Sequence, residues 1–239
     1  MTVGLHTAAA GLAAQQAWLD SLSNDVANVN TPGYRAGRVA FRDLLYQQEG
    51  GIAVGSGVAL TDAWRSGTAG PLLTSDNPLA VAIEGPGFLQ VRRSDGTIAL
   101  TRSGNLQTDS EGVLVTPDGN RLEPRLQIPA GTDLATVTIG TDGTVNAGSK
   151  RLGKIEIVDV PAPSGLQAIG GGMLAPTPES GATAPAPGAK LNQRMIEGSG
   201  VDVATVMIDL VQAQRAYALQ SRVIKTQDQL AEIANGIRR

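Results

Sequence analysis

The chain has 239 residues and a net charge of −3, and no basic cluster gives it an affinity for nucleic acid or for an anionic membrane. The absence of cysteine excludes disulfides, thiolate metal sites and cysteine nucleophiles, and the single histidine, His6, excludes a multi-histidine metal site within one chain. With 30 glycines and only two Trp, three Tyr and two Phe, the composition predicts a thin core of Val, Leu and Ile in one or two domains.

The N-terminal sequence lacks the pattern of a cleaved secretory signal, because the first Lys or Arg is Arg35 and the apolar positions are spaced rather than continuous. No apolar run reaches the roughly 18 to 20 residues that span a bilayer. We therefore expect no membrane insertion and no cleaved signal peptide. Composition alone indicates a cytosolic protein, unless an export route uses the uncleaved N-terminus.

A heptad-like stripe in the first 30 residues predicts a helix over residues 3–29. The stripe consists of Leu5, Leu12, Leu19 and Val26, with Ala8, Gln15, Leu22 and Val29 at the intermediate positions. One polar residue, Gln15, interrupts it. This pattern is typical of a helix that packs against other long helices.

The stretch NVNTPGY, residues 28–34, predicts an abrupt end to that helix. Asn30 is suited to end the helix in a left-handed conformation, and Pro32 cannot continue it. Thr31, Pro32 and Gly33 favour a tight turn. We expect a corner formed by Asn28, Asn30, Thr31, Pro32, Gly33 and Tyr34.

The C-terminal region predicts the longer helix, because neither Gly nor Pro occurs between residues 201 and 235 and either Ser199 or Asp202 can cap its start. One apolar stripe consists of Val203, Val206, Leu210, Ala213, Tyr217 and Ile224. A second, adjacent stripe consists of Ala216, Leu219, Val223, Leu230, Ile233 and Ile237. A helix of about 36 residues is on the order of 54 Å long. Two interpretations stay open: an intramolecular helical hairpin, or packing within an oligomer or fibre.

Between the two helices the signals favour β-structure. Asp-Gly pairs at 95–96, 118–119 and 142–143 are typical of hairpins. They separate candidate strands at residues 88–92, 98–102, 112–116, 137–139 and 154–160. Residues 161–189 are rich in Pro, Gly, Ala, Ser and Thr, which predicts extended loop. The fold class that follows is α+β, with helical ends around a mostly β middle.

No catalytic, cofactor-binding or metal-binding motif is present. The glycine-rich stretches at 55–58, 84–88 and 169–173 lack the Lys-Ser/Thr of a P-loop and the spacing of a dinucleotide-binding turn. Carboxylates such as Asp95, Glu111, Asp118 and Asp142 stand in turns beside glycine, and the serines lack a G-x-S-x-G context. We therefore expect no enzyme activity and no cofactor.

Five stretches, in order and nearly end to end, resemble the flagellar basal-body rod and hook proteins, the axial family of the bacterial flagellum. They are NDVANVNTPGYRAGRVAFRDLLYQ (24–47), NPLAVAIEGPGFLQV (77–91), LTRSGNLQTDSEGVLVTPDGNRLEP (100–124), SGLQAIGGGML (164–174) and VQAQRAYALQSRVIKTQDQL (211–230). The distal rod branch looks most similar, with a proximal rod or hook-type subunit as the alternative. Gly200 departs from the family pattern, in which an Asn is typical.

The resemblance implies that the terminal helices pair into an inner domain around which a mostly β domain lies outside. The expected divisions are 1–34 for the N-terminal helix, 35–65 for a connector, 66–190 for the β-rich outer domain and 191–239 for the C-terminal helix. Stacked copies would form a helical tube that encloses an export channel and transmits torque to the hook. The implied location is the basal body, reached by type III export without cleavage.

The implied partners are further copies of the chain, neighbouring rod and hook proteins, ring or bushing proteins and a rod cap. The residues expected to pack helices between subunits are Leu5, Leu12, Leu19, Leu22, Val26, Val203, Leu210, Tyr217, Ile224 and Leu230. A different class, an oligomeric β-rich adhesin or glycan-binding module, needs an exposed aromatic platform in the middle of the chain. Only Trp64 and Phe88 are available for such a platform.

Overall fold

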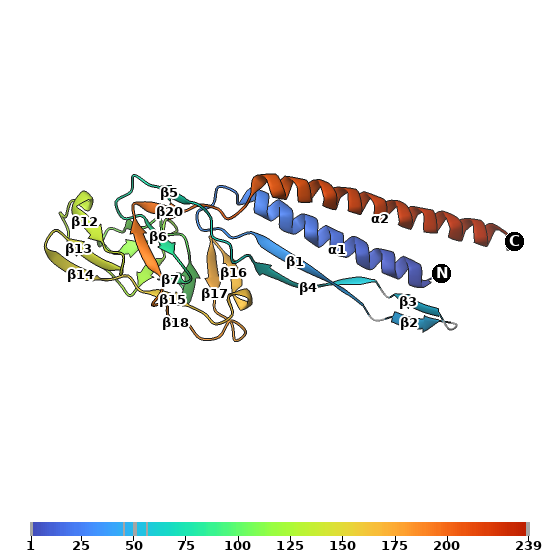
Figure 1. The fold of residues 1–239 in the computed structure, drawn as a ribbon, viewed down its shortest axis with the longest axis horizontal. Helices are drawn as coiled ribbons and strands as arrows, with labels where there is room; N and C mark the ends of the chain where they lie inside the picture. The colour runs from blue at the N-terminus through green and yellow to red at the C-terminus, as the bar shows by residue number, and fades with distance from the viewer. Residues whose placement is uncertain (1, 45, 50–51, 56, 238–239) are drawn as a thin grey trace. The chain divides into compact units, whose positions relative to one another are not determined.

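The computed structural model describes residues 2–44, 46–49, 52–55 and 57–237. It consists of helix α1 (Thr2–Ala27), helix α2 (Val203–Ile237) and a largely β region between them (Figure 1). The expected α+β class, with helices at both ends of the chain, is confirmed. The chain divides into two units, one formed by residues 1–27, 37–66 and 202–239, and the other by residues 28–36 and 67–201. We call them the helical unit and the β unit.

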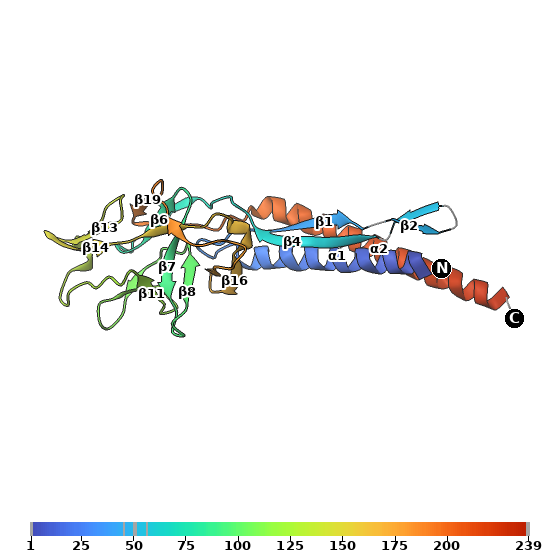
Figure 2. The same cartoon turned by 90° about the horizontal axis from the view of Figure 1, so that it is seen from below.

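The helical unit combines the two helices with two antiparallel strand pairs. Strand β1 (Gly37–Asp43) pairs with β4 (Val58–Arg65), and β2 (Tyr46–Glu49) pairs with β3 (Ile52–Gly55). Figure 2 shows β1 and β4 running along α1, and their residues contact that helix. The backbone N–H of Gly37 donates to Asp25 Oδ1 at 2.8 Å, and the Trp18 ring meets Phe41 edge-on at 6.2 Å. These two contacts anchor the first strand to α1.

The β unit is built around one sheet of nine strands. The order along its main path is β16 (Gln167–Gly170), β17 (Met173–Ala175), β8 (Ile98–Thr101), β7 (Phe88–Arg92), β11 (Arg121–Glu123), β10 (Leu114–Val115) and β9 (Gln107–Thr108). Strand β15 (Ile157–Asp159) also pairs with β7, and β18 (Ala184–Pro185) pairs with β15. All these pairings are antiparallel. Strands such as β7 and β8 are consecutive in the chain, whereas β15 and β17 return to pair with β7 and β8 from much later in the sequence.

Smaller sheets complete the β unit. Strands β12 (Val137–Ile139), β13 (Thr144–Ala147) and β14 (Lys150–Lys154) form a three-stranded meander. Strand β6 (Val81–Glu84) pairs with β19 (Lys190–Gln193), and β5 (Leu72–Thr74) pairs with β20 (Met195–Glu197). Short 3₁₀ turns occupy Leu134–Thr136 and Pro163–Gly165. The β6–β19 and β5–β20 pairings join chain segments that precede the main sheet in sequence to segments that follow it.

The core of the β unit covers both faces of the main sheet. Leu89 and Val91 of β7 belong to the larger apolar cluster, together with Leu114, Leu122 and Leu191. The side chain of Phe88, one residue before Leu89, points to the opposite face and joins a smaller cluster with Leu100, Val158 and Val160. The sixteen buried residues of the larger cluster are all Leu, Val, Ile or Ala. The core is therefore aliphatic, as the composition predicts.

Local sequence signals located several elements and missed others. The predicted helices at 3–29 and from about 201 match α1 and α2 within two residues, and the candidate strands 88–92 and 137–139 match β7 and β12. The prediction that residues 161–189 are loop is wrong in part, because β16 and β17 lie there and β17 pairs with β8. A neighbouring strand supplies the hydrogen bonds that make this Gly-rich stretch extended.

Candidate functional site

The corner after α1 is held by backbone hydrogen bonds. The N–H of Thr31 donates to the carbonyl of Asn28 at 3.0 Å, and the Thr31 hydroxyl donates to Asn28 Oδ1 at 3.1 Å. Tyr34 N–H then donates to the Thr31 carbonyl at 3.2 Å, and the Tyr34 side chain is buried. These hydrogen bonds lie directly after α1, which ends at Ala27.

The left-handed residue of the corner is Gly33, with φ +69°, and not Asn30 as the sequence suggested. Among the described residues, the non-glycine residue with positive φ is Arg194. A Cβ added to Gly33 would lie 2.8 Å from the carbonyl carbon of Arg102 and 2.9 Å from the nitrogen of Ser103. Gly33 is thus required twice, by its backbone conformation and by the approach of a neighbouring backbone.

A buried ion pair lies beneath the corner. The Nη1 atom of Arg102 is 2.7 Å from Glu197 Oε2, and the two side chains are 3% and 0% exposed. The Arg102 Nη2 atom donates to the Gly85 carbonyl at 2.6 Å, and its guanidinium lies 5.6 Å from the Phe88 ring centroid. Backbone and aromatic partners on both sides fix the Arg102 guanidinium in one position.

Arg35, directly after the corner, contributes a second positive charge at 3.8 Å from Glu197 Oε1. Burial lowers the pKa of the Arg35 guanidinium, and the charge of Arg102 lowers it further, whereas Glu197 and Asp159 act in the opposite direction. Taking these charges out of water is costly, so the group is weak evidence for added stability. No motif in the sequence marks this group, because Arg102 and Glu197 are 95 residues apart and Arg35 lies farther still from Glu197.

Asp202 caps the start of α2. Its Oδ1 accepts a hydrogen bond from the N–H of Ala204 at 3.2 Å, and its Oδ2 accepts one from the Thr205 hydroxyl at 2.6 Å. The Thr205 hydroxyl, and after it the Ala204 N–H, lower the pKa of the Asp202 carboxyl. Of the two caps expected, Asp202 takes the role, whereas Ser199 Oγ accepts from Val201 N–H at 3.4 Å, before the helix.

The residues expected to pack helices occupy different environments in the single chain. Leu22 is buried on α1, and Leu12, Leu19 and Val26 are half-buried. Leu5 lies in α1, but its side chain is outside what the structure describes. On α2, the half-buried residues are Leu210, Tyr217 and Ile224, and the exposed ones are Val203 and Leu230. Whether they contact other subunits stays a prediction.

Small residues lie where α1 and α2 meet within the helical unit. Ala14 of α1 and Ala213 of α2 are buried. A Cβ added to Gly11 of α1 would lie 2.5 Å from Oε1 of Gln220 on α2. The side that α2 turns toward α1 therefore corresponds to the first apolar stripe, which includes Ala213.

The large apolar residues described in the second stripe of α2 are exposed, and Ala216 is half-buried. The exposed members include Leu219, Val223, Leu230 and Ile233, which are 61%, 51%, 57% and 59% exposed. Ile208 and Val211 extend the same stripe toward the start of the helix, also exposed. We call these six residues the outer row of α2. Scattered apolar residues are ordinary on protein surfaces, whereas these six recur at helical spacing on one side of α2.

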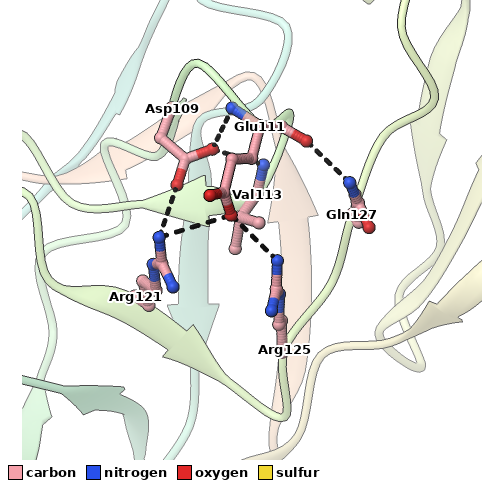
Figure 3. A network of polar contacts seen from close by, with 6 residues as sticks. All are labelled: Asp109, Glu111, Val113, Arg121, Arg125 and Gln127. Atoms are coloured by element: carbon pink, nitrogen blue, oxygen red, sulfur yellow. Dashed lines mark hydrogen bonds and ion pairs between the residues drawn. The ribbon is translucent and has the colours of Figure 1, made fainter.

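The carboxylates in glycine turns act as hydrogen-bond acceptors. Figure 3 shows Asp109 accepting from the backbone N–H groups of Val113 and Glu111, at 2.8 and 2.9 Å. Arg121 and Arg125 approach Glu111 Oε2 at 3.4 and 3.1 Å on the same exposed surface. The Val113 N–H is the largest cause of the lowered pKa of Asp109. A lowered pKa suits a turn acceptor and is opposite to that of a general acid.

Asp95 and Asp142 are also hydrogen-bond acceptors in their turns, and their pKa values are lowered chiefly by the hydroxyls of Thr97 and Thr144. Within the described ranges, no three metal-ligating side chains gather, and neither α1 nor α2 contains an apolar stretch of the length that a membrane span requires. Phe88, one of two aromatic residues available for a glycan platform, is 4% exposed beneath Arg102. It therefore cannot form an exposed platform.

Comparison with known proteins assigns the family. The chain is 35% identical to the flagellar basal-body rod protein FlgG of Caulobacter vibrioides, over 98% of both chains, and 34% identical to FlgG of Borreliella burgdorferi over the full length of both. The chain belongs to the flagellar basal-body rod protein family. It is also 31% identical to the rod protein FlgF of Caulobacter vibrioides, over 90% of this chain and 88% of that protein.

Three models of the rod family match successive parts of the chain. Residues 5–35 match the flagella basal body rod protein model, 82–147 the D1 domain of the FlgE/F/G hook proteins, and 192–237 the C-terminal region of the FlgEFG rod proteins. Both partners of the buried ion pair fall inside matched regions. The first model covers α1 from Leu5 onward and the whole of residues 28–34, as the resemblance of the NVNTPGY stretch indicated.

Proposed function

We propose that this chain is a structural, non-enzymatic subunit of the distal rod of the bacterial flagellum. Copies polymerise into a helical tube that encloses the export channel and transmits torque to the hook. The proposal rests on full-length similarity to rod proteins named FlgG in several bacteria. The observation that carries the polymer is the outer row of α2, because a single chain leaves it uncovered.

In this proposal α1 and α2 pair as the inner helical domain, and the β unit forms the outer domain. A heterologous contact repeated from copy to copy builds a helical polymer, and covering each large apolar side chain of the outer row contributes on the order of 1.5 to 3 kcal/mol. Because six such residues repeat in every subunit, their modest individual contributions add up along the polymer and stabilise a stiff tube. The predicted inter-subunit residues, Leu12 and Leu230 among them, serve this packing.

The partners that follow are neighbouring rod and hook proteins, with ring or bushing proteins and a rod cap meeting the β unit and the growing end. The chain reaches the basal body by type III export without cleavage. Divisions near residues 34, 65 and 190 separate the inner helices, the connector and the outer domain.

A proximal rod subunit of the same family is the second candidate, since the chain is also similar to a second type of rod protein, FlgF of Caulobacter vibrioides. Immunogold electron microscopy of isolated basal bodies that carry an epitope-tagged chain separates the two candidates. Label on the part of the rod next to the hook is expected for the distal subunit. Label near the inner-membrane ring would indicate the proximal one, and unlabelled rods would contradict both.

A further inference from the structure

Two segments of the β unit lie hydrogen-bonded to each other at the points that connect to the helices. The N–H of Gly33 donates to the carbonyl of Glu197 at 2.8 Å, and the N–H of Gly200 donates to the carbonyl of Tyr34 at 2.8 Å. In the chain, the first segment follows α1 and the second precedes α2. The chain therefore enters and leaves the β unit through one hydrogen-bonded pair of segments, which we call the neck (residues 33–35 and 197–200).

A third segment packs closely against the neck. Gly198 N–H donates to the Pro71 carbonyl at 2.8 Å, and a Cβ on Gly200 would lie 3.0 Å from the Thr68 carbonyl oxygen. Gly70 approaches Gly198 so closely that a Cβ there would overlap the Gly198 carbonyl. A side chain at position 200 would therefore require the Thr68 backbone to shift.

Glu197 links the neck to the main sheet through its backbone carbonyl and its side-chain carboxylate. Its backbone carbonyl accepts from Gly33, and its buried carboxylate pairs with Arg102, directly after β8. Arg35, within the neck, faces the other carboxylate oxygen. Removing one partner of a buried pair leaves an uncompensated charge, whereas replacing both by apolar residues of similar size is often neutral in stability. The pair is therefore suited to specify a geometry.

We propose that Arg102 and Glu197 are positioning residues for rod assembly: their buried ion pair fixes the neck in one geometry and thereby sets where the chain departs toward each helix. The consequence for assembly rests on the proposed function, whereas the geometry of the neck does not. Substituting a residue that acts only on stability lowers the protection of backbone amides throughout the β unit. Substituting a positioning residue lowers the protection of the amides in the neck selectively.

Hydrogen exchange in the purified full-length chain tests the geometry. The amides of Gly33 and Gly200 report on the neck, and the amides of Ile128 and Ile155, bonded to Gly112 and Gly143 carbonyls, report on the rest of the unit. In Glu197→Gln, protection at the two neck amides should fall about tenfold to a hundredfold, as expected for losing a hydrogen bond to a charged group. Protection of Ile128 and Ile155 should change much less. An equal fall at all four amides would overturn the proposal.

Two further variants keep the test decisive if Glu197→Gln does not fold. Arg102→Lys retains the charge but loses the planar group that contacts both Glu197 Oε2 and the Gly85 carbonyl. It should give protection between wild type and Glu197→Gln. The double variant Arg102→Met with Glu197→Met removes both charges of the pair and leaves only Arg35 without Glu197. It should therefore melt above Glu197→Gln, which leaves two arginines without the carboxylate, and still show a poorly protected neck. Wild-type protection in the double variant would contradict the proposal. The matched control, Glu123→Gln, breaks the exposed pair with Arg92 at 3.0 Å and should change none of these amides.

Complementation of a strain that lacks the gene tests the consequence. Cells carrying Glu197→Gln or the double variant should not swim, whereas cells carrying Glu123→Gln should swim normally. Swimming by all variants, together with an altered neck, would refute the role in assembly. Normal swimming by the deletion strain itself would refute the proposed function and leave the exchange result standing as a separate finding.

Discussion

Replacing Gly33 by alanine tests whether the corner depends on a close backbone approach. The left-handed conformation at φ +69° costs a residue with a side chain about 1 to 2 kcal/mol. The added Cβ would also lie 2.8 Å from the Arg102 carbonyl carbon, a backbone atom, and relieving such overpacking costs about 1 to 3 kcal/mol. The two effects together should lower the free energy of unfolding by about 2 to 5 kcal/mol.

Gly96→Ala is the matched control, because Gly96 has φ +82° and no atom within 4 Å of an added Cβ. It should cost only the conformational part, about 1 to 2 kcal/mol. Urea unfolding of the purified full chain, followed by circular dichroism at a β-sheet wavelength, measures both variants. Equal losses for Gly33→Ala and Gly96→Ala would refute the close approach, since backbone conformation alone would then explain both.

Three further predictions concern the core, the outer row and the helix cap. Leu89→Ala, in the fully buried cluster, should reduce the free energy of unfolding by about 2 to 5 kcal/mol in urea, and a loss below about 1 kcal/mol would show the core to be looser than described. Leu219→Asp on the outer row should abolish swimming yet leave the melting temperature of the monomer nearly unchanged, and substitution of the half-buried Leu210 by Asp should also abolish swimming. Normal swimming by either variant would contradict helix packing between subunits. The pKa of the Asp202 carboxyl in the folded chain should lie below its usual value of 3.8. Its cap is therefore complete above about pH 4 and is lost as the pH falls through the lowered pKa. An unshifted or raised pKa, measured by NMR, would count against the cap.

The parts of the fold set by local signals were predictable. Pro32 and Gly33 mark the end of α1, and the apolar spacing marks both helices, because a helix stop and a helical stripe depend on residues close in sequence. The Asp-Gly pairs indicated the turns at Gly96, Gly119 and Gly143, each of which has positive φ. Leu219 and its neighbours formed a second stripe in the sequence, and that stripe is the exposed one.

The parts set by distant contacts were not predictable from one sequence. Arg102 and Glu197 are 95 residues apart, and each alone reads as a solvated surface charge. Nothing local distinguishes Gly33 from Asn30 as the left-handed residue; the neighbouring Arg102 backbone decides it. Strands β16 and β17 are extended because β8 offers an edge to pair with, despite a Gly-rich sequence.

The central claim, that the chain is an axial subunit of the distal rod, is tested most directly by electron microscopy of basal bodies from a strain lacking its gene. The account predicts rods that stop short beyond their proximal part and carry no hook, with full length restored by the intact gene. Complete rods with hooks in that strain would contradict it.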